Sequence, residues 1–124
     1  MKKYITGDLL HYKICNAKYL IEVTNTSKHG YCFKGVKDNF NGVICDEFIE
    51  DIPLTPEILE KNGWKKDKDG YFNDSYHIRL CESSINYAAY KVVNKSIVWL
   101  RAVENVPDLQ HLLFGLDISL KIEV

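Results

Sequence analysis

The sequence predicts an α+β fold built mainly of antiparallel sheet. Short runs of alternating apolar and polar residues fill most of the chain, turn residues separate these runs, and only two segments carry helix signals. We expect an N-terminal lobe over residues 1–52, formed by a small SH3-like β-barrel or curled sheet. A C-terminal lobe over residues 53–124 should follow, in the order helix, β-meander, helix, with the two lobes packed as one compact unit.

Four strands are expected in the first lobe. Apolar side chains alternate with others in residues 9–15 and 18–25, Tyr31 and Phe33 point inward in a third strand over residues 31–37, and residues 43–49 form the fourth. Turn residues separate these runs, and the pair Asn41–Gly42 is typical of hairpin positions with positive φ. Several short strands within one small lobe predict a sheet that curls on itself.

The first helix is expected over residues 56–62. Thr55 is a suitable N-cap, and Pro56 suits the first helical position, where its missing N–H has no partner to lose. Gly63 can adopt the left-handed conformation that ends a helix. A helix of two turns is marginal by itself, so packing must stabilise it.

An antiparallel meander is expected over about residues 71–103, after a charged hairpin tip at residues 65–70. Its clearest runs are residues 75–82, 85–93 and 96–103. The last run is apolar on both faces, so we expect it at the centre of the sheet or under a helix.

The second helix is expected over about residues 107–116, opened by Pro107. Leucines recur there at the spacing of a single helical stripe. They are Leu109, Leu112, Leu113 and Leu116. Residues 117–123 alternate again and carry the pattern of a final strand, with Ile118, Leu120 and Ile122 on one face.

Two segments resemble motifs of a protein family. Ile52 to Trp64 (IPLTPEILEKNGW) is similar to I-P-L-T-x-E-x-L-x-x-x-G-F/W, and Leu109 to Leu120 (LQHLLFGLDISL) is similar to L-Q-N-L-Y-F-x-L-T-G-x-x-L. The family consists of small uncharacterised proteins of Bacteroidetes and of their phages and mobile elements. A Gly-Asn or Gly-Asp pair near its start is matched by Gly7–Asp8.

The second segment departs from that pattern. His111 stands in the place of Asn, Leu113 in the place of Tyr, and Asp117–Ile118 in the place of Thr-Gly. The resemblance therefore implies a shared fold rather than a shared site, and it carries over no catalytic residue. Its functional implication is an accessory role in a prophage or mobile element.

Composition and charge narrow the function classes. Hydrophobic residues make up 46% and charged residues 27%, as in ordinary globular proteins. Sixteen basic and 17 acidic side chains give a net charge of −1, which excludes nucleic-acid binding by bulk charge but leaves a local patch open. The start of the chain lacks the apolar run of a secretory signal, and no run is long enough to cross a bilayer. We expect a cytoplasmic protein without a membrane partner.

Metal and cofactor sites are not expected. The cysteines Cys15, Cys32, Cys45 and Cys81 are widely spaced and form no C-x-x-C pair, unlike zinc ligands. Disulfides are disfavoured in a reducing compartment. Phosphate-binding loops and nucleophile motifs are absent from the sequence as well.

One segment combines aromatic and basic residues. It contains Trp64, Lys65, Lys66, Lys68, Tyr71 and Phe72. Such side chains form single-strand nucleic-acid platforms, in which bases stack on rings and lysines contact phosphates. A protein partner is the other candidate, with Trp64 or Phe72 as an apolar anchor. The edge of the N-terminal sheet is the alternative docking place, because its unpaired backbone groups can accept a further strand. The structural alternative is a tryptophan that anchors the core beside a solvated Lys/Asp turn.

The sequence therefore predicts a non-enzymatic interaction module that binds protein or nucleic acid. The alternative is a small hydrolase or nuclease whose site is assembled from distant residues such as Asp8, His11 or His77. The oligomeric state stays open at this level.

Overall fold

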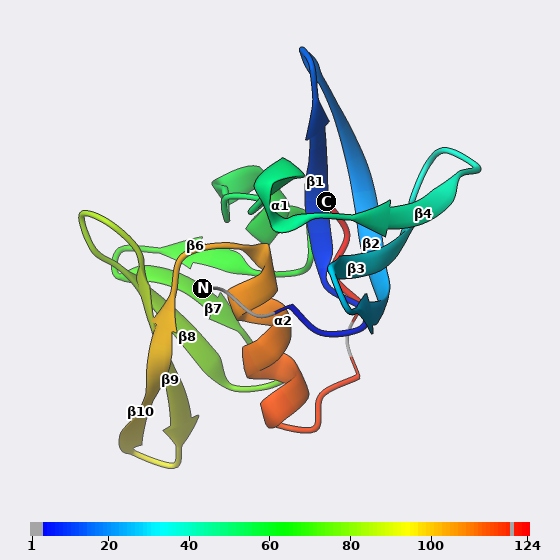
Figure 1. Ribbon diagram of the computed structural model, residues 1–124. Helices are drawn as coiled ribbons and strands as arrows, with labels where there is room; N and C mark the ends of the chain where they lie inside the picture. The colour runs from blue at the N-terminus through cyan, green and yellow to red at the C-terminus, as the bar shows by residue number, and fades with distance from the viewer. Residues whose placement is uncertain (1–3, 120) are drawn as a thin grey trace. The chain divides into compact units, whose positions relative to one another are not determined.

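The chain divides into two units, Met1–Ile52 and Pro53–Val124, each with its own five-stranded antiparallel sheet (Figure 1). The computed structural model describes residues 4–119 and 121–124. The expected α+β class, mainly antiparallel, is confirmed.

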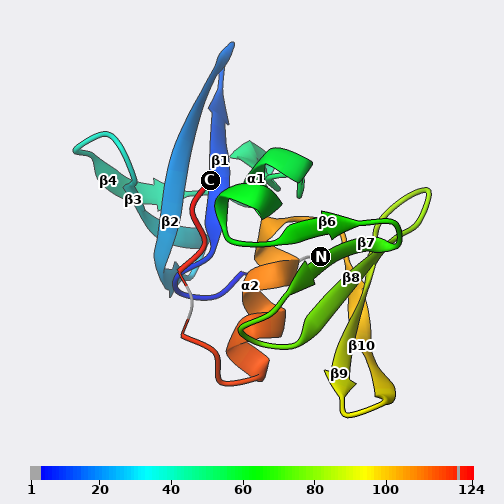
Figure 2. The same ribbon diagram turned by 180° about the vertical axis from the view of Figure 1, so that it is seen from behind.

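The first unit is a sheet in the order β4-β3-β2-β1-β5. Its strands are β1 (Leu9–Ile14), β2 (Ala17–Ser27), β3 (Gly30–Gly35), β4 (Asn41–Ile44) and β5 (Ile49–Glu50). The long β1–β2 hairpin is the blue pair in Figure 1 and is seen from behind in Figure 2. Because β4 and β5 end this order, the sheet is open, and closure into a barrel is not confirmed.

The prediction of one strand over residues 43–49 is wrong beyond Ile44. Strand β4 ends at Ile44, and a 3₁₀ turn, η1 (Asp46–Phe48), follows it. The Phe48 N–H donates to the Cys45 carbonyl at 3.1 Å, which keeps the acidic residues of this turn in solvent. The chain then returns to pair Ile49 with Tyr12.

The core of the first sheet is rich in aromatic residues. Its buried members are Tyr4, Leu10, Ile21, Val23, Tyr31, Phe33 and Ile44. The ring of Phe33 meets those of Tyr12 and Phe40 edge to face, with both pairs of centroids 5.5 Å apart. Such contacts stabilise a small core beyond the burial of area alone.

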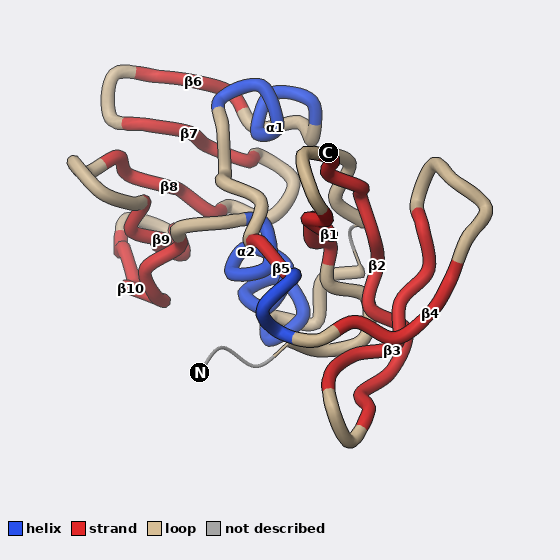
Figure 3. Tube along the Cα trace, turned by 45° about the horizontal axis from the view of Figure 1, so that its top comes forward, coloured by secondary structure: helices blue, strands red, loops and turns tan. Residues whose placement is uncertain are grey.

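The second unit is an up-and-down meander in the order β10-β9-β8-β7-β6. Helix α1 (Pro56–Lys61) precedes β6 (Lys65–Asp67), β7 (Gly70–Asn73), β8 (Ile78–Glu82), β9 (Tyr87–Val93) and β10 (Ser96–Val103). Helix α2 (Val106–Gly115) closes the unit and contacts β10. Figure 3 shows these strands in red and both helices in blue.

The local signals for α1 are confirmed. Thr55 Oγ1 accepts a hydrogen bond from the Ile58 N–H at 3.3 Å, and Gly63 has φ +87°. Leu59 is fully buried and supplies the packing that a helix of this length requires.

Helix α2 starts one residue before the expected range, with Asn105 as its N-cap. Leu109, Leu112 and Leu113 are buried, as the stripe predicts. The helix ends in a Schellman motif, because Asp117 has φ +60° and the Ile118 N–H donates to the Leu113 carbonyl at 2.9 Å.

The final strand expected over residues 117–123 is not present in residues 117–119 and 121–123, and Leu120 lies outside the described residues. Side-chain hydrogen bonds hold this segment instead. Asn62 Oδ1 accepts from the Glu123 N–H, and Asn62 Nδ2 donates to the Glu123 carbonyl, both at 2.7 Å. The apolar alternation reflects the burial of Ile122 beside this tether.

Of the two positions expected for residues 96–103, the centre of the sheet is wrong, whereas helix α2 does contact β10. Strand β10 lies at an edge of the sheet, and only its C-terminal end, at Val103, is buried. Its apolar residues therefore face solvent on both sides over the first half of the strand.

Candidate binding surface

The aromatic residues of the predicted patch do not form a surface platform. Trp64 and Tyr71 are each 1% exposed and belong to the core, while Phe72 is half-buried. Trp64 follows the left-handed Gly63 at the end of α1, and this turn directs the chain and the ring inward. Bases cannot stack on buried rings, so the core-anchor alternative describes Trp64 correctly, and Tyr71 is a core residue as well.

The lysines of the patch are exposed, and two of them form ion pairs. Lys65 Nζ lies 3.5 Å from Asp74 Oδ2, and Lys66 Nζ lies 2.9 Å from Glu82 Oε1. The hydrogen bond to Glu82 raises the pKa of Lys66. Lys68 is exposed at the hairpin tip. Because carboxylates offset much of this charge, the β6–β7 hairpin is a weak electrostatic site for phosphates.

Asp67 on the same hairpin is paired with Arg79. Arg79 Nη1 lies 2.9 Å from one carboxylate oxygen and 2.7 Å from the other. This hydrogen bond is the main cause that lowers the pKa of Asp67. The guanidinium also lies over the Phe72 ring, 5.2 Å from its centroid. Arg79 thus covers the half-buried ring.

Asp8, His11 and His77, the residues named for the enzyme alternative, each have different neighbours. Asp8 is buried, and its Oδ2 accepts from the Ile5 N–H at 2.9 Å. His11 lies three positions further on, where strand alternation directs its side chain to the opposite face. His77 belongs to the other unit, in a turn with φ +55°, and its carbonyl accepts from the Val92 N–H at 2.8 Å. Hydrogen bonds give Asp8 and His77 structural roles in these turns.

His11 is half-buried on strand β1. Its Nδ1 atom is buried without a hydrogen-bond partner. Burial is the main cause that lowers its pKa, Lys18 adds to this effect, and Glu50 opposes it. Burial therefore favours the neutral imidazole over the charged one.

Metal-ligating side chains do not gather in the part of the chain that the structure describes, where no group of three or more His, Cys, Asp or Glu residues could hold an ion. All four cysteines are free thiols.

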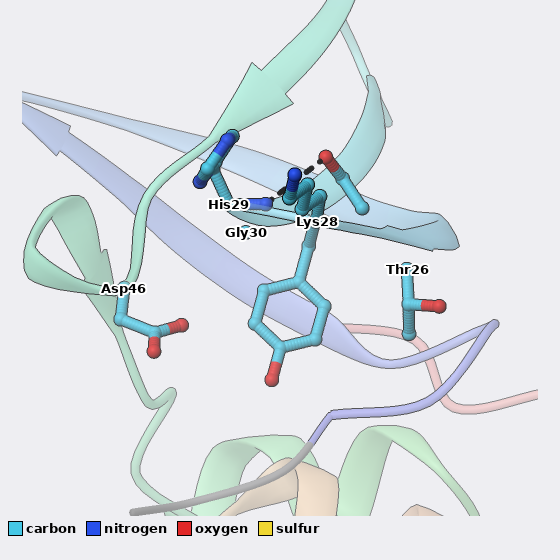
Figure 4. A pocket seen from close by; sticks show the side chains of 7 residues that line it. Thr26, Lys28, His29, Gly30 and Asp46 are labelled. Carbon is cyan, nitrogen blue, oxygen red and sulfur yellow. Dashed lines mark hydrogen bonds between the residues drawn. The ribbon is translucent and has the colours of Figure 1, made fainter.

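A pocket of about 400 Å³ lies at the β2–β3 turn. It is lined by residues 26–31 and by Asp46, which Figure 4 shows across the pocket from Thr26. Lys28, His29 and Asp46 are exposed. Solvent screens exposed charges, so these groups would distinguish ligands only weakly.

A group of exposed apolar residues lies on β9 and β10, near the turn that joins these two strands. We call it the β10 edge surface and define it as Val93, Ile97, Val98 and Trp99. Their side chains are 47%, 63%, 51% and 60% exposed, respectively. In β10, Ile97 and Trp99 lie on one face and Val98 on the other, so both faces of the edge are apolar.

The two edges of this sheet differ in length and charge. Strand β6 has three residues, Lys65, Lys66 and Asp67, and all are charged. Strand β10 has eight residues, and its first five, Ser96 to Leu100, carry no charge. Short, charged edges prevent a further strand from pairing, whereas long apolar edges favour it. The β6 edge is therefore protected against pairing with a further strand, and the β10 edge is not.

The backbone N–H and carbonyl groups of Ile97 and Trp99 point away from β9, toward the open edge of the sheet. Ile97 pairs with Val92, and the Val92 N–H donates to His77 on the other side of β9. In an antiparallel ladder Ile97 then directs its own N–H and carbonyl away from β9, and so does Trp99 two residues later. The ladder shifts register between Trp99 and Arg101, so Leu100 forms a bulge that ends this regular stretch.

Sequence reasoning missed this surface, although a signal was present. In a meander the last strand in the chain is also an edge strand of the sheet. Considered alone, the apolar residues on both faces of residues 96–103 predict burial. Combined with the meander topology, the same pattern indicates an uncovered edge.

Comparison with family models, with curated proteins and with solved structures gives no match to this chain. None of the helices in the described residues has the length and apolar character needed to span a bilayer.

Proposed function

We propose that this protein is a protein-binding module that accepts an extended strand of another polypeptide along β10. The observation that carries the proposal is the β10 edge surface, where outward backbone groups and exposed apolar side chains occur on the same residues. Strand addition uses both: main-chain hydrogen bonds supply affinity, and alternate side chains supply specificity.

A protein partner fits this surface better than a nucleic acid. Residues Ser96 to Leu100 are uncharged, and the Arg101 guanidinium behind them is 3.3 Å from Asp108 Oδ1. Sites for single-stranded nucleic acid combine stacking rings with a positively charged groove. Trp99 supplies a ring, but its neighbours supply aliphatic side chains rather than charge.

The apolar area also favours a partner that removes it from water. Ile97, Val98 and Trp99 are all more than half exposed. Burial stabilises a complex by about 25 cal/mol per Å² of apolar area, before the entropy of association is subtracted. A strand that carries apolar side chains on both faces would cover all three residues.

The test is a selection of displayed random peptides of about 12 residues, long enough for one full strand. We expect enriched peptides with apolar residues on both strand faces, and Trp99→Lys should weaken their binding at least about tenfold. Ile85→Lys is the matched control, because Ile85 is 80% exposed in the β8–β9 loop, at the opposite end of β9 from the β10 edge surface. N-methylation of alternate peptide amides should abolish binding if a strand is added. Failure to enrich any peptide, or equal binding to Trp99→Lys, would refute the proposal.

A further inference from the structure

The sheet of the second unit has one covered face and one uncovered face. Tyr71, Leu80 and Ala89 are buried on the covered face. Helix α2 lies on this side, because Arg101 pairs with Ala89 and its guanidinium reaches Asp108 of the helix. The alternate residues of the strands direct their side chains to the other face, where every described side chain is half-buried or exposed.

Four side chains cross the uncovered face in one row, one from each of the strands β7 to β10. Phe72 pairs with Arg79, Arg79 pairs with Tyr90, and Tyr90 pairs with Trp99. Neighbouring strands lie about 4.8 Å apart, so the row is roughly 14 Å long. Tyr90 is half-buried and Trp99 is 60% exposed, which leaves two adjacent aromatic side chains at one end of the row in contact with solvent.

Arg79 is the polar member of the row, and its contacts fix its position. Its guanidinium lies over the Phe72 ring, 5.2 Å from the centroid, and Nη1 donates to both carboxylate oxygens of Asp67. Nη1 uses only part of the donors of a guanidinium. A ligand beside Tyr90 therefore meets N–H donors and carboxylate acceptors at one place.

Charge on this face is balanced within the row and its neighbours. Arg79 is paired with Asp67, and Lys65, which pairs with Phe72 in the ladder, has its Nζ 3.5 Å from Asp74 Oδ2. A nucleic-acid backbone would meet a carboxylate beside each of these cations, which opposes the binding of phosphates. The row therefore favours a ligand without net charge that has both apolar surface and hydrogen-bonding groups.

We propose that the uncovered face binds a neutral glycan of β-1,4-linked glucose or xylose units, with sugar rings over Tyr90 and Trp99. Pyranoses with equatorial hydroxyls present flat faces of C–H groups, whose partial positive charge is attracted to the negative face of an aromatic ring. Their hydroxyls donate and accept, so the Arg79–Asp67 pair satisfies both functions. A β-1,4-linked chain is an extended ribbon and follows a straight row of side chains.

This site goes beyond the proposed function and does not depend on it. Strand addition uses the outward backbone groups of β10 and both faces of its edge. Glycan binding uses side chains of one face only, and Tyr90 and Arg79 lie on inner strands of the sheet. Trp99 contributes to both surfaces, so the two activities are separated by their ligands.

Isothermal titration calorimetry of the full chain with cellohexaose and xylohexaose tests the proposal. We expect a dissociation constant below about 1 mM for at least one of them. Maltohexaose, whose α-links coil the chain, should bind at least about tenfold more weakly, and an oligothymidylate should not compete. Absence of binding by both β-linked sugars at about 5 mM, equal binding of maltohexaose, or tighter binding of the oligothymidylate would overturn the proposal.

Substitutions on opposite faces of β10 locate the site. Trp99→Ala should weaken glycan binding at least about tenfold, and Trp99→Phe should retain most of the binding because it keeps a ring. Val98→Ala is the matched control, because Val98 is the preceding residue of the strand, is 51% exposed and lies on the other face. Equal weakening by Trp99→Ala and Val98→Ala would show that the glycan does not lie on this row.

Tryptophan fluorescence gives a second readout that needs no variant. The chain has two tryptophans, of which Trp64 is 1% exposed and Trp99 is 60% exposed, so acrylamide quenches mainly Trp99. A bound β-linked hexaose should protect Trp99 from quenching, and binding without protection would overturn the proposed position. A chain that binds the selected peptides but none of the sugars would overturn the glycan site and leave the proposed function standing. The reverse result would refute the proposed function alone.

Discussion

Truncation of Leu113 tests how strongly α2 holds the second unit together. Leu113 is 1% exposed on the buried stripe of the helix. Leu113→Ala removes three carbon atoms, which at about 0.8 kcal/mol each corresponds to about 2.4 kcal/mol of transfer free energy. The cavity left behind adds to this, so we expect a loss of about 3–5 kcal/mol in the free energy of unfolding.

The next residue supplies the control. Phe114 is 75% exposed, so Phe114→Ala should change the free energy of unfolding by less than about 0.5 kcal/mol. Both tryptophans, Trp64 and Trp99, belong to the second unit, so urea titration followed by tryptophan fluorescence reports on the unit that contains α2. A loss below about 1 kcal/mol for Leu113→Ala, or equal losses for the two variants, would refute the packing described for this helix.

Three further perturbations follow from single contacts. Thr55→Ala removes the N-cap of α1 and should lower stability by about 0.5–2 kcal/mol in urea titration, whereas Thr55→Ser should retain most of it. Gly70→Ala should lower the melting temperature more than an ordinary surface substitution does, because an added Cβ would lie 2.1 Å from the Leu80 carbonyl oxygen and because φ is +142°. A melting temperature within a degree or so of that of the parent chain would contradict this. The lowered pKa of His11 means that the unfolded chain binds its proton more readily. Stability should therefore fall as the pH drops through about 6.5, measured by urea midpoints in circular dichroism. His11→Gln should flatten this part of the pH profile, and an unchanged profile would show that His11 is not its source.

Local signals in the sequence predicted local structure well. Thr55, Pro56 and Gly63 act within a few residues of one another, and the helix they enclose ends within one residue of the expected position. The leucine stripe of α2 was equally informative, because helical spacing and burial are coupled along one element.

Features that depend on distant contacts could not be predicted in the same way. Trp64 lies among lysines in the sequence, but the turn at Gly63 directs it into the core. Ile44 and Ile49 both fall in the run expected as one strand, yet Ile49 pairs with Tyr12, far away in the sequence. The exposure of β10 depends on what covers the sheet, and apolar composition alone predicts burial there.

The paired hydrogen bonds between Asn62 and Glu123 have a consequence for the order of folding. They link the end of α1 to a residue 61 positions later. At translation rates of about 5–20 residues per second, Glu123 is added roughly 3–12 s after Asn62. A six-residue helix is unstable alone, so α1 must wait on a growing ribosome-bound chain for its last partners. The segment with the clearest helix signals is therefore expected to consolidate late, after the meander between these two residues has paired.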